Sequence, residues 1–160
     1  MMDVQAIRSL RCAGKHEEAR TLAARLAATS PQDAPLQYEA ACVHDHLGLE
    51  AEAVPYYVRA IAAGLPNDLL RSAYVGLGST YRVLGRFLES LRVLDRGLAE
   101  FPQAREIIVF RAMTLHNLGR GKQAVEALLR VVAETADDPD IQEYSRAIEQ
   151  YAQDVERTWP

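Results

Sequence analysis

The sequence predicts an all-α fold built from repeated pairs of antiparallel helices, and three observations carry this prediction. Glycine recurs at intervals of 34, 37 and 34 residues, at Gly14, Gly48, Gly85 and Gly119. A small residue follows each glycine five positions later, as Ala19, Ala53, Ser90 and Ala124. Apolar residues on both sides of the glycines are spaced three and four apart, which places them on one stripe of a helix. A period near 34 with this content is typical of a helical repeat array.

The clearest repeat unit spans residues 74–102. Its first helix carries a stripe at Tyr74, Leu77, Gly78 and Tyr81, and Gly85 ends that helix. Its second helix carries a stripe at Phe87, Leu91, Leu94, Leu98 and Phe101, and Pro102 follows where a helix must stop. Two amphipathic helices joined by so short a turn are expected to lie antiparallel, each burying its stripe against the other.

These residues resemble the tetratricopeptide repeat family. That family's pattern is an aromatic residue, Leu-Gly and Tyr in the first helix, then a small, a large and a small residue in the second helix, and a final Pro. The matching positions, in order, are Tyr74, Leu77, Gly78, Tyr81, Ser90, Leu94, Gly97 and Pro102. The resemblance covers nearly the whole chain and implies a right-handed α-solenoid of about four helix pairs with a C-terminal capping helix.

The four repeats are expected at about residues 3–31, 33–65, 68–102 and 103–136. The first has a short leading helix followed by one rich in small residues, and the second has Ala40-Ala41 where the family has Leu-Gly. Gly64 and Pro66 mark a break before the third repeat, and we place the three extra residues of the 37-residue interval as one added turn from Asp68 to Arg71. The fourth repeat keeps the periodicity with a weaker match.

A last helix is expected from Asp138 to about Arg157, with one apolar stripe on an acidic background. An open stack of repeats exposes the apolar face of its final pair, so a half-polar helix is needed to cover that face. Trp159-Pro160 lies past this pattern and is interpreted as a tail or a packing anchor. The stripe consists of Ile141, Tyr144, Ile148, Tyr151 and Val155.

Composition favours one soluble globular domain over residues 1–160, because 49% of the residues are apolar and 25% are charged. Two cysteines are too few for a disulfide scaffold, and no signal peptide or membrane-spanning run is apparent, so we expect a cytoplasmic protein. Arginine makes up 16 of the 18 basic residues, which is typical of a GC-rich genome and carries no functional inference. We expect a bacterial source. The net charge of −4 argues against nucleic acid as a partner, and nothing points to a membrane.

No motif for catalysis, cofactor binding or metal binding is found, and we expect neither an enzyme nor a cofactor. His44 and His46 are two residues apart on a helix, about 200° around its axis, and so cannot hold one ion together. His44 falls at a core position of the repeat and is expected to be buried. Gly76-Leu-Gly78 lies in a helical stripe and lacks the strand and third glycine of a nucleotide-binding loop.

The remaining candidate is a surface, because the first helices of stacked pairs line the inner wall of a repeat array. The resemblance places partner-binding residues on this concave wall, and their mixed polar and apolar character suits a peptide or helix of another protein. When the family's wall positions are counted onto this chain, they also include Val4, Cys12, Val75, Val83 and Val109. The partner-binding residues are Arg8, Arg11, Tyr38, Cys42, Asp45, His46, Ser79, Arg82, Met113, His116 and Asn117.

Two alternatives stay open at this stage. The chain could be a self-associating assembly piece, with a homodimer formed through its first or last helix. Less favoured is a ligand- or metal-dependent enzyme or regulatory subunit, which only Cys42, His46, His116 and Asn117 support. The family's clamp for a terminal carboxylate needs Lys, Asn and Arg at the equivalents of Val4, Arg8, Cys42, Ser72 and Gly76, and none of these positions has the required residue. Arg8, Arg11 and Arg82 could hold an acidic segment in another way.

Overall fold

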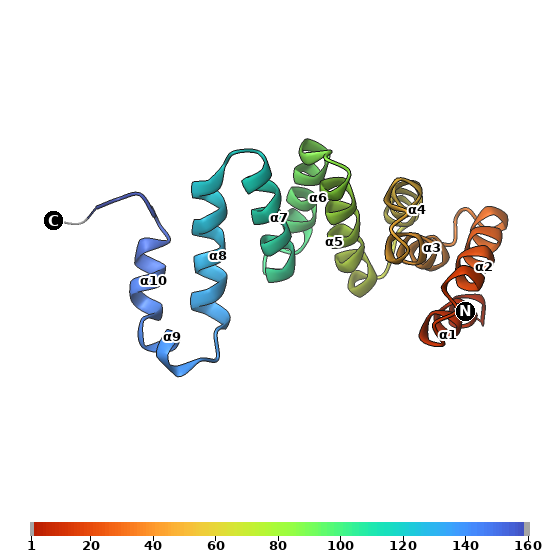
Figure 1. The fold of residues 1–160 in the computed structure, drawn as a ribbon, viewed down its shortest axis with the longest axis horizontal. Helices are drawn as coiled ribbons and strands as arrows, with labels where there is room; N and C mark the ends of the chain where they lie inside the picture. Colours follow the sequence, from red (N-terminus) through yellow and green to blue (C-terminus); the bar gives the residue numbers. More distant parts are fainter. Residues whose placement is uncertain (1, 159–160) are drawn as a thin grey trace. The chain divides into compact units, whose positions relative to one another are not determined.

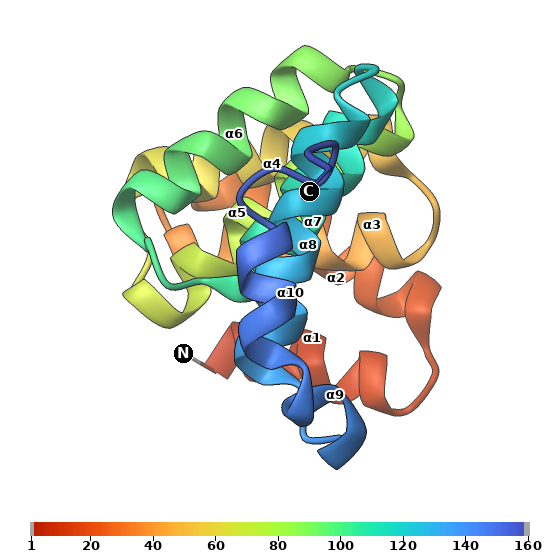
Figure 2. The same ribbon diagram turned by 90° about the vertical axis from the view of Figure 1, so that its left-hand side faces the viewer.

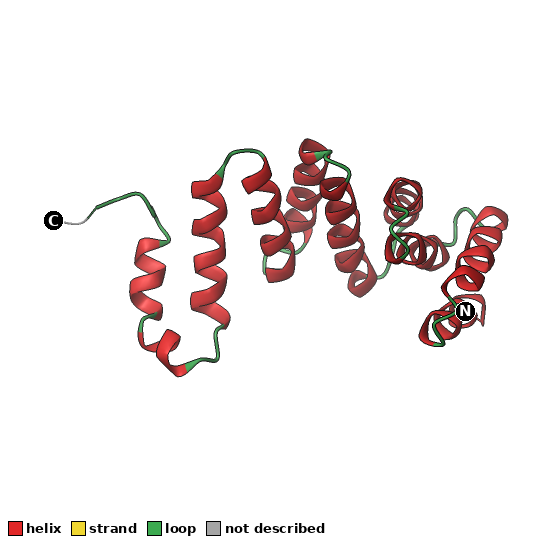
Figure 3. Cartoon of the chain, viewed as in Figure 1, coloured by secondary structure: helices red, strands yellow, loops and turns green. Residues whose placement is uncertain are grey.

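The structure, a computed structural model, describes residues 2–158 of the 160-residue chain. Within these residues there are ten helices (Figures 1 and 2) and no strand (Figure 3), so the predicted all-α fold is confirmed. Trp159 and Pro160 lie outside the described residues. The helices are α1 Met2–Cys12, α2 His16–Thr29, α3 Ala34–His46, α4 Glu50–Ala63, α5 Asn67–Val83, α6 Phe87–Glu100, α7 Arg105–Asn117, α8 Gly121–Thr135, α9 Pro139–Glu143 and α10 Ser145–Tyr151.

The recurring glycines end the first helix of each pair with the same backbone turn. Gly14, Gly48, Gly85 and Gly119 have φ angles of 72° to 74°, in the left-handed region that side chains disfavour. After each glycine, the next amide N–H donates to a carbonyl five residues back, as from Lys15 to Leu10 and from Arg120 to Leu115, both at 2.9 Å. These bonds cap carbonyls at the helix end that have no partner within the helix.

Replacing Gly85 by alanine should destabilise the protein by about 1–2 kcal/mol, because an L-residue is strained in the left-handed region. No atom lies within 4 Å of a Cβ placed there, so the effect would come from the backbone and not from a clash. Urea unfolding measures it, with Gly121→Ala as the control. Gly121 lies inside a helix with equally open space. Equal stability of the two variants would contradict the prediction.

The chain divides into two compact units, unit 1 over Met1–Arg86 and unit 2 over Phe87–Pro160. The boundary lies at the start of α6, inside the third predicted repeat, and the prediction of one domain over residues 1–160 stays a prediction. In the first, second and fourth predicted repeats the two helices of each pair contact each other, as α1 with α2, α3 with α4 and α7 with α8.

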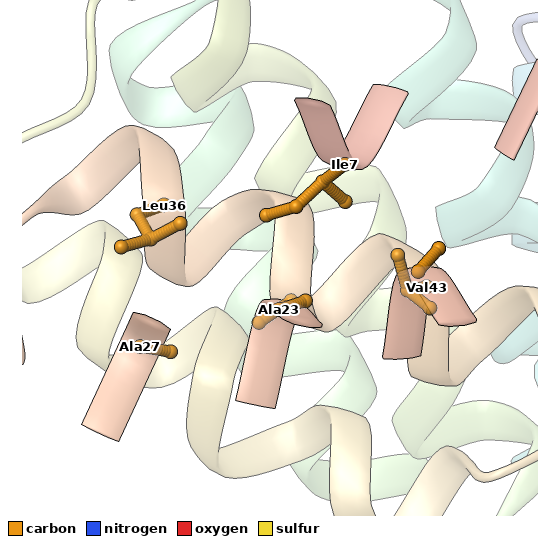
Figure 4. Close-up of a cluster of buried hydrophobic side chains, with 7 residues drawn as sticks. Ile7, Ala23, Ala27, Leu36 and Val43 are labelled. Atoms are coloured by element: carbon orange, nitrogen blue, oxygen red, sulfur yellow. The ribbon is translucent and has the colours of Figure 1, made fainter. Parts of the chain in front are cut away.

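Unit 1 is organised around α3, which contacts α1, α2, α4 and α5. Because neighbours lie on most of its sides, α3 buries eight of its residues, including His44, as predicted. Figure 4 shows the cluster that joins the first three helices, in which Ile7 of α1 meets Ala23 of α2 and Val43 of α3. The alanines of α2 allow close approach, so the first repeat packs through small residues.

The third leading helix is longer than its counterparts. Helix α5 has 17 residues, whereas α3 and α7 have 13 each. It begins at Asn67, directly after Pro66, and Gly64 has the left-handed φ of 87° expected for the residue that ends α4. The prediction of one added turn at the start of this helix is confirmed.

In unit 2, α7 packs between α6 and α8. Leu91, Leu115 and Ala124 bring one side chain from each of these helices into a common core, which Ala112 completes. The hydroxyl groups of Ser90 and Thr114 form a buried hydrogen bond of 2.9 Å between α6 and α7. The small residue predicted at position 90 therefore also bonds to the facing helix.

Leu94→Ala should lower the free energy of unfolding by about 2–5 kcal/mol, because it removes a large apolar side chain from a core position. Leu94 is fully buried, at 0% exposure, whereas Leu88 on the same helix is 59% exposed. Leu88→Ala is therefore the matched control and should change stability by less than about 0.5 kcal/mol. Chemical denaturation compares the two, and a similar loss in both would show that Leu94 is not a core residue.

The continuous helix predicted over residues 138–157 is not formed, and this prediction was wrong. Asp138 caps the start as expected, but the chain turns at Tyr144 between α9 and α10, and residues 152–158 are not helical. Helix α10 lies alongside α8 (Figures 1 and 2) with Ala152 buried. Most of the predicted stripe is exposed, at 36% to 60%, for Ile141, Tyr144, Tyr151 and Val155.

Contacts with α8 explain why the last helix stops early. Arg130 donates a hydrogen bond of 2.8 Å to the carbonyl of Ala152, and the amide of Val155 donates to Glu126 at 3.2 Å. Lys122 forms ion pairs with Asp154 and Glu156. Arg130 and Glu126 thus satisfy backbone groups that a longer helix would have paired internally, and Lys122 holds the side chains of the segment that follows α10.

Candidate functional site

The leading helices of unit 1 form one layer, since α3 contacts α1 on one side and α5 on the other. Eight of the predicted partner-binding residues lie on these helices. His46 is exposed, and the other seven are half-buried. We call this region the α1–α3–α5 surface. It consists of Arg8 and Arg11 of α1, Tyr38, Cys42, Asp45 and His46 of α3, and Ser79 and Arg82 of α5.

Both arginines of α1 are held by a buried carboxylate that the sequence analysis missed. Glu39 of α3 is 2% exposed. Its Oε1 accepts a hydrogen bond from Nε of Arg8, and its Oε2 pairs with a terminal nitrogen of Arg11 at 3.0 Å. A buried carboxylate needs such partners because desolvation disfavours its charge. Glu39 thus fixes the position of the two guanidinium groups and neutralises part of their charge.

A second cluster joins α3, α4 and α5 through hydroxyl and carboxylate groups. The hydroxyl of Tyr57, from α4, donates to Oδ2 of Asp45 at 3.2 Å and contacts the sulfur of Cys42 at 3.9 Å. Thr80 of α5 donates to the other carboxylate oxygen of Asp45 at 3.3 Å. The ring of Tyr38 lies edge-on to that of Tyr57, with centroids 6.2 Å apart. These contacts therefore link the side chains of three helices within the α1–α3–α5 surface.

Burial shifts the proton equilibria of this cluster toward the neutral forms. It raises the pKa of the Tyr38 and Tyr57 hydroxyls, and for Tyr57 the nearby Cys42 and Asp45 add to the effect. It also raises the pKa of the Cys42 thiol, against the opposing influence of hydrogen bonds with the two tyrosines. A cysteine nucleophile needs the opposite shift, toward the thiolate. The cluster is thus suited to hydrogen bonding at neutral pH.

Gly76 gives the Tyr57 ring the space it occupies. A Cβ at position 76 would lie 2.5 Å from the Tyr57 hydroxyl oxygen and 2.6 Å from the ring carbon that bears it. These distances are far shorter than any ordinary contact, so a side chain at position 76 would displace the ring. The absence of a side chain in the middle of α5 is therefore a packing requirement.

Gly76→Ala should destabilise the protein by about 1–3 kcal/mol through overpacking. An alanine in place of glycine within a helix normally stabilises by about 0.5–1 kcal/mol, so the sign of the change is the test. Thermal and chemical unfolding would measure it beside Gly121→Ala, where no atom lies within 4 Å of the added Cβ. A stability gain for Gly76→Ala would show that the ring moves aside without cost.

The Asp45 carboxyl should make stability depend on pH. Burial raises its pKa, although hydrogen bonds from Tyr57 and Thr80 oppose the shift. A folded state with the raised pKa binds a proton more readily than the unfolded chain, so this contribution to stability falls as pH rises from about 4 through the folded pKa. The unfolding free energy of the wild type minus that of Asp45→Asn should therefore be larger at pH 4.5 than at pH 7.

Urea unfolding at these two pH values measures the difference. The exposed Glu52, replaced by Gln, supplies the comparison for general effects of surface charge. If the difference in unfolding free energy between wild type and Asp45→Asn is the same at both pH values, the raised pKa of Asp45 is refuted.

Two hollows lie on either side of Arg8. One, of about 340 Å³, is lined by Val4 and Gln5 of α1, Asp33 and Pro35 at the start of α3, and Leu69 of α5. The other, of about 320 Å³, is lined by Arg11 and Cys12 of α1, His16 of α2 and His46 of α3. Arg8 lines both. Arg8, Arg11 and His46 were predicted from the sequence as partner-binding residues. His16 was not, because it lies at the start of an outer helix and not on one of the leading helices.

The remaining predicted residues lie in unit 2, in the last turns of α7. Met113 is half-buried, and His116 and Asn117 are exposed. Among residues 2–158, no group of three or more His, Cys, Asp or Glu residues is arranged to hold a metal ion. None of the helices described is long and apolar enough to span a membrane.

Comparison with known proteins gives one family match. A family model described as "Tetratrico peptide repeat" matches residues 34–155. Superkiller protein 3 of Saccharomyces cerevisiae is 27% identical over 93 residues, which is 58% of this chain. The chain spans only 6% of the length of that relative.

Solved structures with a similar fold include YrrB, described as a TPR protein with an unusual peptide-binding site. YrrB is 19% identical, with a TM-score of 0.72 over 96% of this chain and 78% of its own. A putative kinesin light chain from Podosopora anserina with nearly identical TPR-like repeats has a TM-score of 0.68 at 19% identity, over 95% of this chain and 89% of its own. At these identities the likeness shows the fold alone.

Proposed function

Because the chain belongs to the tetratricopeptide repeat family, which the match over residues 34–155 shows, we propose that it is a non-catalytic protein-binding module. Its α1–α3–α5 surface binds a peptide segment or a helix of another protein. The fold itself suggests a protein–protein interaction module, and YrrB, a structure of similar fold, has a peptide-binding site. The partner, its segment and the residues that hold it are the parts of this proposal that need testing.

The observation that carries the proposal is the pair of hollows that meet at Arg8. The guanidinium group of Arg8, which lines both hollows, is already bonded to Glu39, so its position is set before a ligand arrives. A preformed site loses little side-chain freedom on binding, and this favours affinity. One hollow offers guanidinium and imidazole groups, and the other offers Val4, Pro35 and Leu69, which suits polar and apolar side chains of a peptide.

The chemistry of the surface supports binding without catalysis. Burial raises the pKa of Cys42 and Tyr57, so neither is a reactive anion at neutral pH. Asp45 and Thr80, which belong to the same cluster, are themselves engaged in hydrogen bonds within it. Nucleophilic catalysis needs a base aimed at an accessible nucleophile, which this cluster does not supply.

Peptide selection from a random displayed library, followed by fluorescence anisotropy with the selected peptides, tests the proposal. Gln5 is exposed and lines one hollow, so Gln5→Trp should fill the hollow without disturbing the core. We expect this variant to weaken binding by about tenfold or more, equivalent to about 1.4 kcal/mol. Glu52→Trp, at an exposed position on the outer helix α4, is the matched control and should bind like the wild type. Equal affinity of the two variants for the selected peptides would rule out the α1–α3–α5 surface as the peptide-binding site.

A second candidate function is self-association through the last helices. Tyr144 and Tyr151 are 60% and 51% exposed, and large aromatic side chains are common in protein interfaces. Light scattering over a concentration series would detect a dimer, and Tyr144→Ser with Tyr151→Ser should abolish it. A strict monomer at all concentrations would exclude this candidate. The cytoplasmic location and bacterial source expected from the sequence stay predictions.

A further inference from the structure

The hollow at the turn end of α1 has a composition unlike the rest of the surface. Its lining comes from three helices: Arg8, Arg11 and Cys12 from α1, His16 from α2 and His46 from α3. The rings of His16 and His46 lie with centroids 4.6 Å apart and a tilt of 46°. A volume of about 320 Å³ leaves room for a carboxylate group and for bridging water.

The charges around this hollow are predominantly positive. Glu39 accepts from Arg8 through Nε and from Arg11 through one terminal nitrogen, but each guanidinium has five N–H donors. One buried carboxylate therefore faces two guanidinium groups. The helix α2 also begins here, and its N-terminus has no side-chain cap, since the side chain of Lys15 pairs with the Glu18 carboxylate at 3.1 Å. A helix N-terminus adds a partial positive charge.

The nearest acidic side chains are occupied elsewhere. Asp45, next to His46, accepts hydrogen bonds from Tyr57 and Thr80. Glu17 pairs with Arg20 and Glu18 with Lys15, and both line a different hollow, on the face shared by α1 and α2. In contrast, Nδ1 of His16 is buried and has no hydrogen-bond partner among residues 2–158. The His16 ring, which lines the hollow, thus has one unsatisfied hydrogen-bonding atom.

We propose that this hollow binds one carboxylate group of a polypeptide held on the α1–α3–α5 surface, an inference that rests on the proposed function. Arg11 supplies charge-assisted hydrogen bonds, and His16 and His46, which line the same hollow, contact the same group. The carboxylate belongs either to an Asp or Glu side chain or to the C-terminus of the bound segment. Arg8 is the only lining residue at a position that holds a terminal carboxylate in the chaperone-binding members of the family, and Arg11, His16 and His46 stand at other positions.

The four histidines of the chain provide the measurement and its internal control. Proton NMR resolves the imidazole Hε1 signals, which are assigned from single His→Asn variants. The probes are three pentapeptides: one capped at both ends with a central Glu, the same peptide with Gln, and the Gln peptide with a free C-terminus. We expect the two carboxylate probes to shift the signals of His16 and His46 saturably, while the capped Gln peptide leaves them unchanged. The tighter of the two carboxylate probes identifies the source of the group.

His44, buried in α3, and His116, exposed on α7, should not respond. Equal shifts of His116, or equal shifts with the capped Gln peptide, would overturn the inference. His46→Asn, at an exposed position that lines the hollow, should weaken carboxylate binding by about fivefold. His116→Asn, the matched control, should leave the affinity unchanged. An unaltered carboxylate affinity in His46→Asn would also contradict the inference.

The outcomes separate this inference from the proposed function. If Gln5→Trp abolishes binding of selected peptides but no carboxylate probe shifts His16 or His46, the surface binds peptides and the carboxylate subsite is refuted. If the probes shift the two histidines but Gln5→Trp and Glu52→Trp bind selected peptides equally, the subsite exists and the wider surface is refuted. Arg8 lines both hollows and is left unchanged in all variants, since its pairing with Glu39 supports α1.

Discussion

The left-handed turn at the recurring glycine is the constraint on which the helix pairs depend. At φ near 73° the chain leaves the first helix and starts the second within a few residues, and the amide after the glycine caps the helix it has just left. The turn fixes how far apart the two helices begin, so the small residue five positions later can meet the partner helix closely. Ala19, Ala53 and Ala124 are all buried for this reason, and Ser90 adds a hydrogen bond at the same place.

Much of the fold followed from the sequence because its determinants are local. The glycine period, the stripes and the added turn of α5 depend on residues a few positions apart, which a single chain displays directly. The C-terminal helix was predicted wrongly for the opposite reason. Its end at Tyr151 depends on Arg130 and Glu126, which compete for its backbone groups, and on Lys122, which pairs with Asp154. All three lie about 20 to 30 residues earlier in the chain. The spacing of apolar residues along the chain does not reveal contacts between residues so far apart in the sequence.

The candidate site shows the same division. The offsets of the repeat predicted which positions of α1, α3 and α5 belong to the surface, but not what holds them. Glu39 lies 28 and 31 residues from the arginines it pairs with, and Tyr57 reaches the surface from an outer helix. A charged residue inside the apolar stripe of α3 was the available signal for Glu39. Its consequence is that the guanidinium groups are oriented before binding, so their remaining donors select where an anion can lie.

The contact between Gly76 and Tyr57 has a consequence for how related chains can diverge. The two residues share one volume, since the tyrosine hydroxyl extends to within 2.5 Å of where a Cβ would stand. Neither position can therefore change freely while the other is kept. Homologues that acquire a larger residue at position 76 must also have lost the bulky ring at position 57, and with it the hydrogen bond to Asp45. The steric limit therefore couples the residues that can stand at the two positions.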